Sequence, residues 1–180
     1  MVQTEDTLAE TFRRVRALYD DEKRFRPGDR ASLRAAKHPD DLLTDGAFWR
    51  LASLAPPESR SRLRYAVVCF DAAEHAASAP RFATSLRRAV YGEVDDDDLV
   101  GRALRFRRLL ASEDCAELVH HLRRALRHAA QAGAGLKVDW GVLGADITRW
   151  ERSPRVRQRW AEDFYTARVE GDQAANAARE

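Results

Sequence analysis

The run Ala66-Val-Val-Cys-Phe70 is the longest stretch of purely apolar side chains without a hydroxyl in this sequence. It lies inside a helical pattern whose apolar positions are Leu63, Val67, Phe70, Ala73 and Ala77. This spacing predicts a long helix near residues 58–78. Because its centre is apolar nearly all round, we expect it to be the most buried helix of the protein. Five apolar residues are far fewer than the roughly 20 that a membrane span needs.

Outward from this run, helical spacing covers almost the whole chain, and no segment alternates like a strand. Further helices are expected near residues 5–24, 29–36, 48–52, 82–90, 99–110, 113–129, 140–151 and 154–164. Asp29, Ser112, Asp139 and Ser153 are the expected N-caps. The predicted fold is therefore all-α, a compact two-lobed bundle of about eight to nine helices. Residues 1–92 form the predicted N-terminal lobe, residues 93–170 the C-terminal lobe and residues 171–180 a frayed tail.

Positive charge is concentrated in one part of the chain. The 180 residues carry 31 Lys and Arg against 29 Asp and Glu, a net charge of +2. Residues 101–160 hold 13 of these basic residues and only 6 acidic ones, a net charge of +7. Only three basic residues of the chain are Lys, a bias that suits phosphate binding but also follows from a GC-rich genome. The N-terminus has no signal-peptide pattern and the two cysteines form no disulfide framework, so we expect a cytoplasmic protein.

The sequence contains no motif typical of catalysis or cofactor binding. It has no Gly-rich phosphate loop, His-Glu-x-x-His, Cys-x-x-Cys or Gly-x-Ser-x-Gly. His121 and His128 are about two helical turns apart, too far to share a metal ion. We therefore expect no cofactor, no metal and no catalytic residue. A small enzyme using His120, His121 or Cys115 stays an alternative, since a helix start lowers the pKa of a thiol there. Asp95–Asp98 is interpreted as negative charge before a helix N-terminus, with a cation site as the alternative.

Arginines recur on the faces of predicted helices that are opposite their apolar positions. In the helix around residues 118–129, three arginines share the solvent face. Other basic residues lie at regular spacing in the preceding helix, in the short helix 29–36 and around the turn 149–159. The candidate nucleic-acid-binding residues are Arg30, Arg34, Lys37, Arg105, Arg108, Arg123, Arg124, Arg127 and Arg149. Ion pairing on a solvated surface is the alternative interpretation, but acidic neighbours are few and phosphate backbone is the commonest partner of such a surface. We expect Trp140, Trp150 and Trp160 to pack in the core, with base stacking as the alternative.

Several of these stretches, in this order, resemble the CasB family, the small subunit of the type I-E CRISPR surveillance complex Cascade. They are Gly28-Asp-Arg-Ala-Ser-Leu-Arg-Ala-Ala36, Ala47-Phe-Trp-Arg-Leu51, Arg105-Phe-Arg-Arg-Leu-Leu110, His121-Leu-Arg-Arg-Ala-Leu126, Val138-Asp-Trp-Gly-Val-Leu143 and Val156-Arg-Gln-Arg-Trp-Ala-Glu-Asp-Phe-Tyr165. The resemblance implies a helical, two-lobed subunit without catalytic activity. Its implied partners are the backbone and large subunits of Cascade, a second copy of the chain, the single-stranded DNA of the R-loop and crRNA.

The resemblance also implies that a basic groove holds the displaced non-target strand during antiviral defence. The matching positions are Arg34, Arg123 and Arg124, with Ala35 where some relatives carry a second arginine. Base pairing reads the sequence in such complexes, while the protein holds backbone. The leading hypothesis is thus a non-catalytic nucleic-acid-binding subunit. The alternative is a pure assembly subunit whose basic faces contact acidic partner surfaces.

Overall fold

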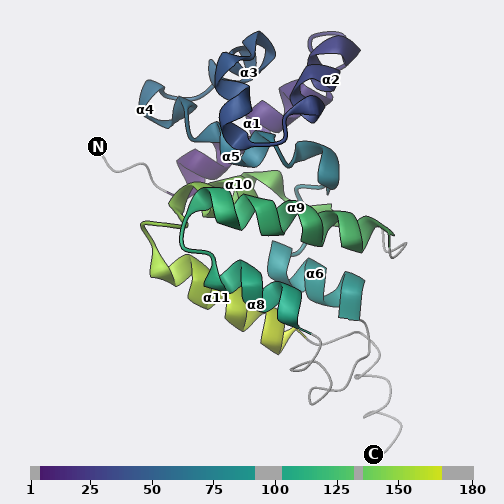
Figure 1. Ribbon diagram of the computed structural model, residues 1–180, viewed down its shortest axis with the longest axis vertical. Helices are drawn as coiled ribbons and strands as arrows, with labels where there is room; N and C mark the ends of the chain where they lie inside the picture. Colours follow the sequence, from purple (N-terminus) through teal and green to yellow (C-terminus); the bar gives the residue numbers. More distant parts are fainter. Residues whose placement is uncertain (1–4, 92–102, 132–135, 168–180) are drawn as a thin grey trace, which may run out of the picture.

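The computed structural model describes residues 5–91, 103–131 and 136–167, and their regular structure is mainly helical (Figure 1). The α-helices are α1 (Glu5–Asp20), α2 (Pro27–Ala35), α3 (Gly46–Ala52), α4 (Pro57–Arg60), α5 (Leu63–Val67), α6 (Phe82–Tyr91), α8 (Leu104–Ala111), α9 (Cys115–Gln131), α10 (Trp140–Arg149) and α11 (Pro154–Thr166). The remaining elements are the 3-10 helices η1 (Pro39–Thr44) and η2 (Phe70–Ala72) and the strands β1 (Glu74–His75) and β2 (Lys137–Val138). The predicted all-α fold is confirmed.

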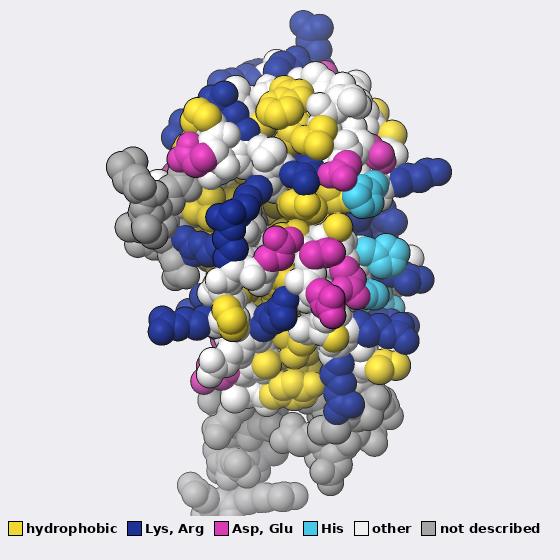
Figure 2. Space-filling view, turned by 60° about the vertical axis from the view of Figure 1, so that its left-hand side comes forward, with side chains coloured by type: hydrophobic (Ala, Val, Ile, Leu, Met, Phe, Trp, Pro, Cys, Tyr) yellow, Lys and Arg dark blue, Asp and Glu magenta, His cyan; other side chains and the backbone are white. Residues whose placement is uncertain are grey.

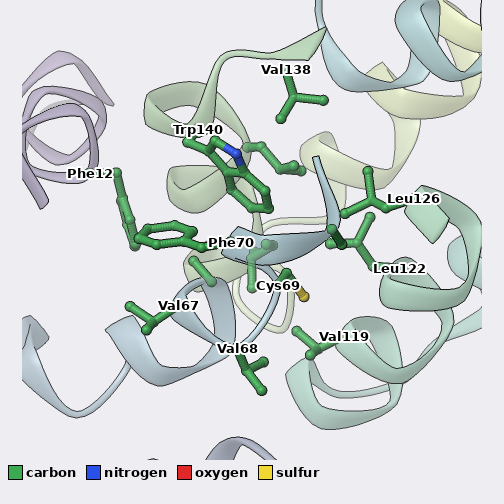
Figure 3. Packing of buried hydrophobic residues seen from close by; sticks show 14 of the residues in the cluster. Phe12, Val67, Val68, Cys69, Phe70, Val119, Leu122, Leu126, Val138 and Trp140 are labelled. Atoms are coloured by element: carbon green, nitrogen blue, oxygen red, sulfur yellow. The ribbon is translucent and has the colours of Figure 1, made fainter. Parts of the chain in front are cut away.

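The apolar run lies at the centre of the core, as the sequence predicts, but it does not continue one long helix. Residues 57–75 form α4, α5, η2 and β1 in succession, so the helix expected over 58–78 is wrong. The break lets Cys69 and Phe70 contact different neighbours, with α9 on one side and α1 and α10 on the other (Figure 3). Two carbonyls released by the break find donors: the Arg16 guanidinium donates to the Phe70 oxygen at 2.6 Å, and the Trp140 indole donates to the Ala73 oxygen at 3.2 Å. The segment is buried on every side. It therefore forms several short elements whose backbone oxygens accept hydrogen bonds from Arg16 and Trp140, and does not form one regular helix.

Two short strands join parts of the chain that are far apart in sequence. β1 pairs in parallel with β2, with Glu74 opposite Lys137 and His75 opposite Val138. The Trp140 backbone N–H, just after β2, donates to His75 Nδ1 at 3.3 Å. Strands of two residues carry no alternating pattern, which is why the sequence did not indicate them.

α1 packs along α10 at very short range. A Cβ placed on Gly144 would lie 2.5 Å from the ring of Phe12, and one on Gly141 would lie 2.6 Å from Cγ of Arg13. Asp139 begins α10 as predicted by accepting the Gly141 N–H, and it also pairs with Arg13 at 2.9 Å. The two glycines thus permit a helix contact that fixes α10 beside α5 and the central run.

A second group of helices, α6, α8, α9 and α11, packs together below this layer (Figure 1). Phe106 of α8 stacks on Phe164 of α11 with ring centroids 3.8 Å apart. The three expected core tryptophans are all buried: Trp140, Trp150 and Trp160. The buried carboxylate of Asp146 accepts the Trp160 indole N–H at 2.7 Å and pairs with Arg159, which compensates for its burial.

Two predicted helix starts are wrong and two are placed as expected. α2 begins at Pro27, and Asp29 lies inside its first turn, where its carboxylate accepts the Arg26 N–H. Asp114, rather than Ser112, caps α9 by accepting the Glu117 N–H at 2.8 Å. Ser153 precedes Pro154 at the start of α11, as predicted.

The division into lobes at residues 92 and 93 stays a prediction. That boundary, the run Asp95–Asp98 and the glycines Gly133 and Gly135 lie outside the described residues. Helices from both sides of the boundary are interleaved, because α10 packs on α1 while α6 packs on α11. No helix among the described residues is long and apolar enough to cross a membrane.

Candidate nucleic-acid interface

The long helix α9 carries the central part of the basic surface. Its apolar face, which includes Leu118, Leu122, Ala125 and Ala129, is buried in the core. Arg124 and Arg127 lie on the opposite face and are exposed. The core therefore fixes the direction in which this helix presents its arginines.

The first hollow lies between α8 and α9 and has a volume of about 420 Å³. We call it the α8–α9 hollow. It is lined by Arg105, Arg108, His121, Arg124, Ala125, Arg127, His128 and Gln131. Within residues 5–91, 103–131 and 136–167, no carboxylate lines it. An Arg105 Nη1 donates to His128 Nε2 at 3.0 Å, which joins the two helices across the hollow.

The second hollow lies between α9 and the connection from α2 to η1, and its volume is about 550 Å³. We call it the α2–α9 hollow. Its lining residues are Arg34, Ala35, Ala36, Lys37, His38, Pro39, Ala116, Val119, His120, Arg123, Arg124 and Arg127. Again no carboxylate is among them. Arg124 and Arg127 line both hollows and so connect them.

Arg123 is held differently from its neighbours on α9. Its guanidinium donates to the backbone oxygens of Ala36 at 3.1 Å and Lys37 at 3.4 Å. These oxygens lie at the end of α2, where a helix leaves carbonyls without an internal partner. Arg123 thereby holds α2 and α9 together and keeps Lys37 and Arg34 on the same side of the molecule as Arg124.

A third hollow of about 630 Å³ continues from the second at Arg34, which lines both. This α1–α2 hollow has mixed charge, because Asp20, Asp71 and Glu74 line it together with arginines. Arg30 also lines it and already pairs with Glu22 at 3.2 Å. The α1–α2 hollow therefore attracts an anion less strongly than the two hollows beside α9.

The structure thus brings eight of the nine candidate residues together in a continuous series of hollows. We call these eight the basic track: Arg30, Arg34, Lys37, Arg105, Arg108, Arg123, Arg124 and Arg127. Among the described residues, Arg34, Arg108 and Arg124 have no carboxylate within ion-pair distance. Arg149 lies at the end of α10, is half-buried and lines none of the three hollows.

Four histidines line these hollows, although none of them is among the nucleic-acid-binding residues predicted from the sequence. His121 and His128 line the α8–α9 hollow, and His38 and His120 line the α2–α9 hollow. Figure 2 shows histidines gathered at the right-hand edge of the molecule, with Lys and Arg side chains projecting beside them. For His120, His121 and His128, a position three or four residues from Arg124 on α9 was the available signal.

Burial and neighbouring charge shift two of the side chains considered as catalytic candidates. The pKa of His121 is lowered by burial first, and then by His120, Arg108 and Arg124, while Glu117 acts in the opposite direction. Burial raises the pKa of the Cys115 thiol to about 12, so the lowering expected from its place at a helix start is wrong. The Cys115 thiol donates to the Ile147 oxygen and is not exposed. Within the described residues, no three His, Cys, Asp or Glu side chains are grouped to hold a metal ion.

Known proteins resemble this chain in both sequence and fold. The family model of CRISPR-associated protein Cse2 matches residues 29–165, which is most of the chain and includes the whole basic track. The chain belongs to the Cse2 family. Cse2 is the CasB subunit of type I-E systems, so the resemblance seen in the sequence motifs is confirmed.

A solved structure shares the Cse2 fold seen here. It is a chain in the crystal structure of E. coli Cascade bound to a PAM-containing dsDNA target. That chain is 21% identical and superposes with a TM-score of 0.61, over 92% of this Cse2 chain and 100% of its own length. None of the curated proteins compared matches this chain.

Proposed function

We propose that this protein is a non-catalytic subunit of a CRISPR RNA-guided surveillance complex, Cascade, and that its basic track holds the backbone of the displaced non-target DNA strand. One observation carries the proposal: two hollows that no carboxylate of the described residues lines are joined by shared arginines, Arg124 and Arg127, across α2, α9 and α8. Membership of the Cse2 family and likeness to a chain in a DNA-bound Cascade structure support it.

The lining of the two hollows favours contact with backbone over contact with bases. Among the described residues that line them there is no Phe, Tyr or Trp, so these residues offer successive bases no aromatic platform on which to stack. The guanidinium groups suit phosphate oxygens, which they bind in a bidentate manner. Binding of this kind ignores base sequence, as is required of a protein that meets a different strand at each target.

A small contribution from such contacts is enough to matter. When a guide RNA pairs with one DNA strand, the hybrid formed is about as stable as the duplex it replaces. Contacts that hold the freed strand therefore tip a nearly balanced exchange toward the open state. In this role the protein needs no nucleophile, and burial of Cys115 removes the most reactive candidate from access to a substrate.

The proposed partners are the backbone and large subunits of Cascade and a second copy of this chain. In this arrangement the track is completed by neighbours along the complex, which extends the path available to a strand.

The test is an R-loop assay with the reconstituted complex. The variant Arg105→Gln/Arg124→Gln/Arg127→Gln removes exposed cations from both hollows, and Arg155→Gln removes an exposed arginine of α11 that lines neither. We expect the triple variant to assemble normally but to shorten the R-loop lifetime and to lose crosslinks to the non-target strand. An R-loop lifetime equal to that of the Arg155→Gln control contradicts the proposal. Loss of assembly with unchanged strand contacts in the remaining complex supports the alternative, in which the basic faces bind acidic partner surfaces.

A further inference from the structure

The histidines of this chain are distributed unevenly in space. Four of the five line the two hollows beside α9, and only His75 lies elsewhere, paired with the backbone near Trp140. A histidine is neutral at alkaline pH and cationic at acidic pH. In an anion-binding hollow it therefore changes the charge of that hollow as the pH passes through the range near 7. The two in the α8–α9 hollow, His121 and His128, have the more closely defined surroundings.

His128 contacts α8 through one ring nitrogen. Arg105 can only donate, so the Nε2 of His128, 3.0 Å away, is the acceptor of this hydrogen bond. Protonating His128 removes that acceptor and places two cations side by side. An anion between them reverses the balance, because a phosphate accepts from Arg105 and from a protonated His128 at the same time.

His121 faces mostly positive charge. Partial burial opposes its protonation most, and the adjacent His120, Arg108 of α8 and Arg124 of α9 act in the same direction. Glu117, whose carboxylate lies 3.8 Å from His121 Nε2, is the acidic neighbour that favours it. A phosphate entering the hollow offsets the charge of Arg108 and Arg124, and so removes their share of the opposition to a protonated His121.

We propose that binding of an anionic strand in the α8–α9 hollow is coupled to proton uptake by His121 and His128, which thereby become additional phosphate ligands. The inference rests on the proposed function of this surface. Because the bound state holds more protons than the free state, affinity for the strand rises as pH falls. The gain in affinity begins when pH falls through the range in which the histidines of the strand-bound protein protonate. It is complete once the histidines of the unbound protein are protonated as well. For each proton taken up, the limit is about tenfold in affinity per pH unit.

The experiment measures binding of a labelled oligo-dT to the full chain by fluorescence anisotropy at constant ionic strength. Oligo-dT is chosen because thymine does not titrate near neutrality. We expect wild-type affinity to rise about tenfold or more between about pH 8 and about pH 6. The variant His121→Gln/His128→Gln keeps salt-dependent binding at about pH 8, yet its affinity rises at least about threefold less than that of the wild type over the same range, because only His38 and His120 of the α2–α9 hollow remain. Arg155→Gln is the matched control and keeps the full pH dependence.

A second measurement on the unmodified protein counts the protons directly. Calorimetric titration with oligo-dT in two buffers of different ionisation enthalpy gives the number taken up, which we expect to lie between about one and about two near pH 6.5. Zero uptake, or a double variant with undiminished pH dependence, overturns the inference while salt-dependent binding leaves the proposed function in place. If oligo-dT shows no salt-dependent binding at either pH, both fail for the isolated chain.

Discussion

Replacing both Arg124 and Arg127 with glutamine removes the two cations that connect the hollows beside α9. Both side chains are exposed, and the single ion pair seen for them, Arg127 with Asp71 at 4.0 Å, is long and exposed to solvent. Glutamine keeps the helix-forming tendency and much of the side-chain length. The fold is therefore expected to survive, and the change reports on charge at the surface.

The size of the effect follows from the number of exposed cations on the track. Six of its eight members are exposed: Arg34, Lys37, Arg105, Arg108, Arg124 and Arg127. If each neutralises one phosphate of a single strand, the logarithm of affinity falls with the logarithm of salt with a slope of about −4. Raising salt from about 50 to about 200 mM then weakens wild-type binding about 300-fold. With four contacts left, the slope becomes about −3 and the loss falls to about 50-fold.

The assay is fluorescence anisotropy of oligo-dT against the full chain at four or more salt concentrations, all at one pH. Arg155→Gln is measured in parallel because it removes one exposed charge from α11 outside the hollows. Its slope is expected to match the wild type. If the double variant keeps the wild-type slope, the two arginines do not contact phosphate and the reasoning about the track is refuted. If Arg155→Gln lowers the slope as much per charge, binding depends on overall charge and has no defined path.

Three further predictions concern stability and reactivity. Gly144→Ala places a methyl group against the ring of Phe12, so we expect a loss of about 1–3 kcal/mol in urea unfolding, whereas Gly46→Ala, with open space around it, is neutral or slightly stabilising. Modification of the native Cys115 thiol by a disulfide reagent at about pH 8 is expected only after unfolding, since burial raises its pKa to about 12; rapid labelling of the folded chain contradicts this. The Cys115 backbone N–H lowers the pKa of Glu151 in the folded protein. The Glu151 carboxylate therefore stabilises the fold at pH values above its unfolded pKa, and this contribution is lost as pH falls through its lower folded pKa. Glu151→Gln is accordingly expected to flatten the decline of unfolding free energy between about pH 5 and about pH 3, and an unchanged decline excludes the contribution.

Much of the fold follows from spacing along the chain. Apolar residues at helical intervals indicate α1, α6, α9 and α11 directly, and Asp139 marks the start of α10. Helix starts at α2 and α9 were misplaced by two or more residues because several polar side chains lie within one turn of each start, and packing selects among them.

The candidate site was predictable as a set of arginines, but its shape was not. Sequence periodicity places Arg124 and Arg127 on the solvent face of one helix, and it places Arg34 on another. It contains no information on the distance between those helices. That distance depends on contacts such as the one from Arg123 to the backbone oxygens of Ala36 and Lys37, which are 87 and 86 positions away.

By itself, the sequence determined that this protein is helical, that its central apolar run is buried and that Arg124 and Arg127 face solvent, because these properties depend on neighbours within a few residues. Only the tertiary structure decided that the apolar run breaks into short pieces, that Arg149 lies apart from the track and that histidines share the hollows with arginines. The physical reason is that burial from several sides and contact between distant helices are properties of the packed chain. A residue's own helix fixes the direction of its side chain, whereas the rest of the molecule fixes what that side chain meets.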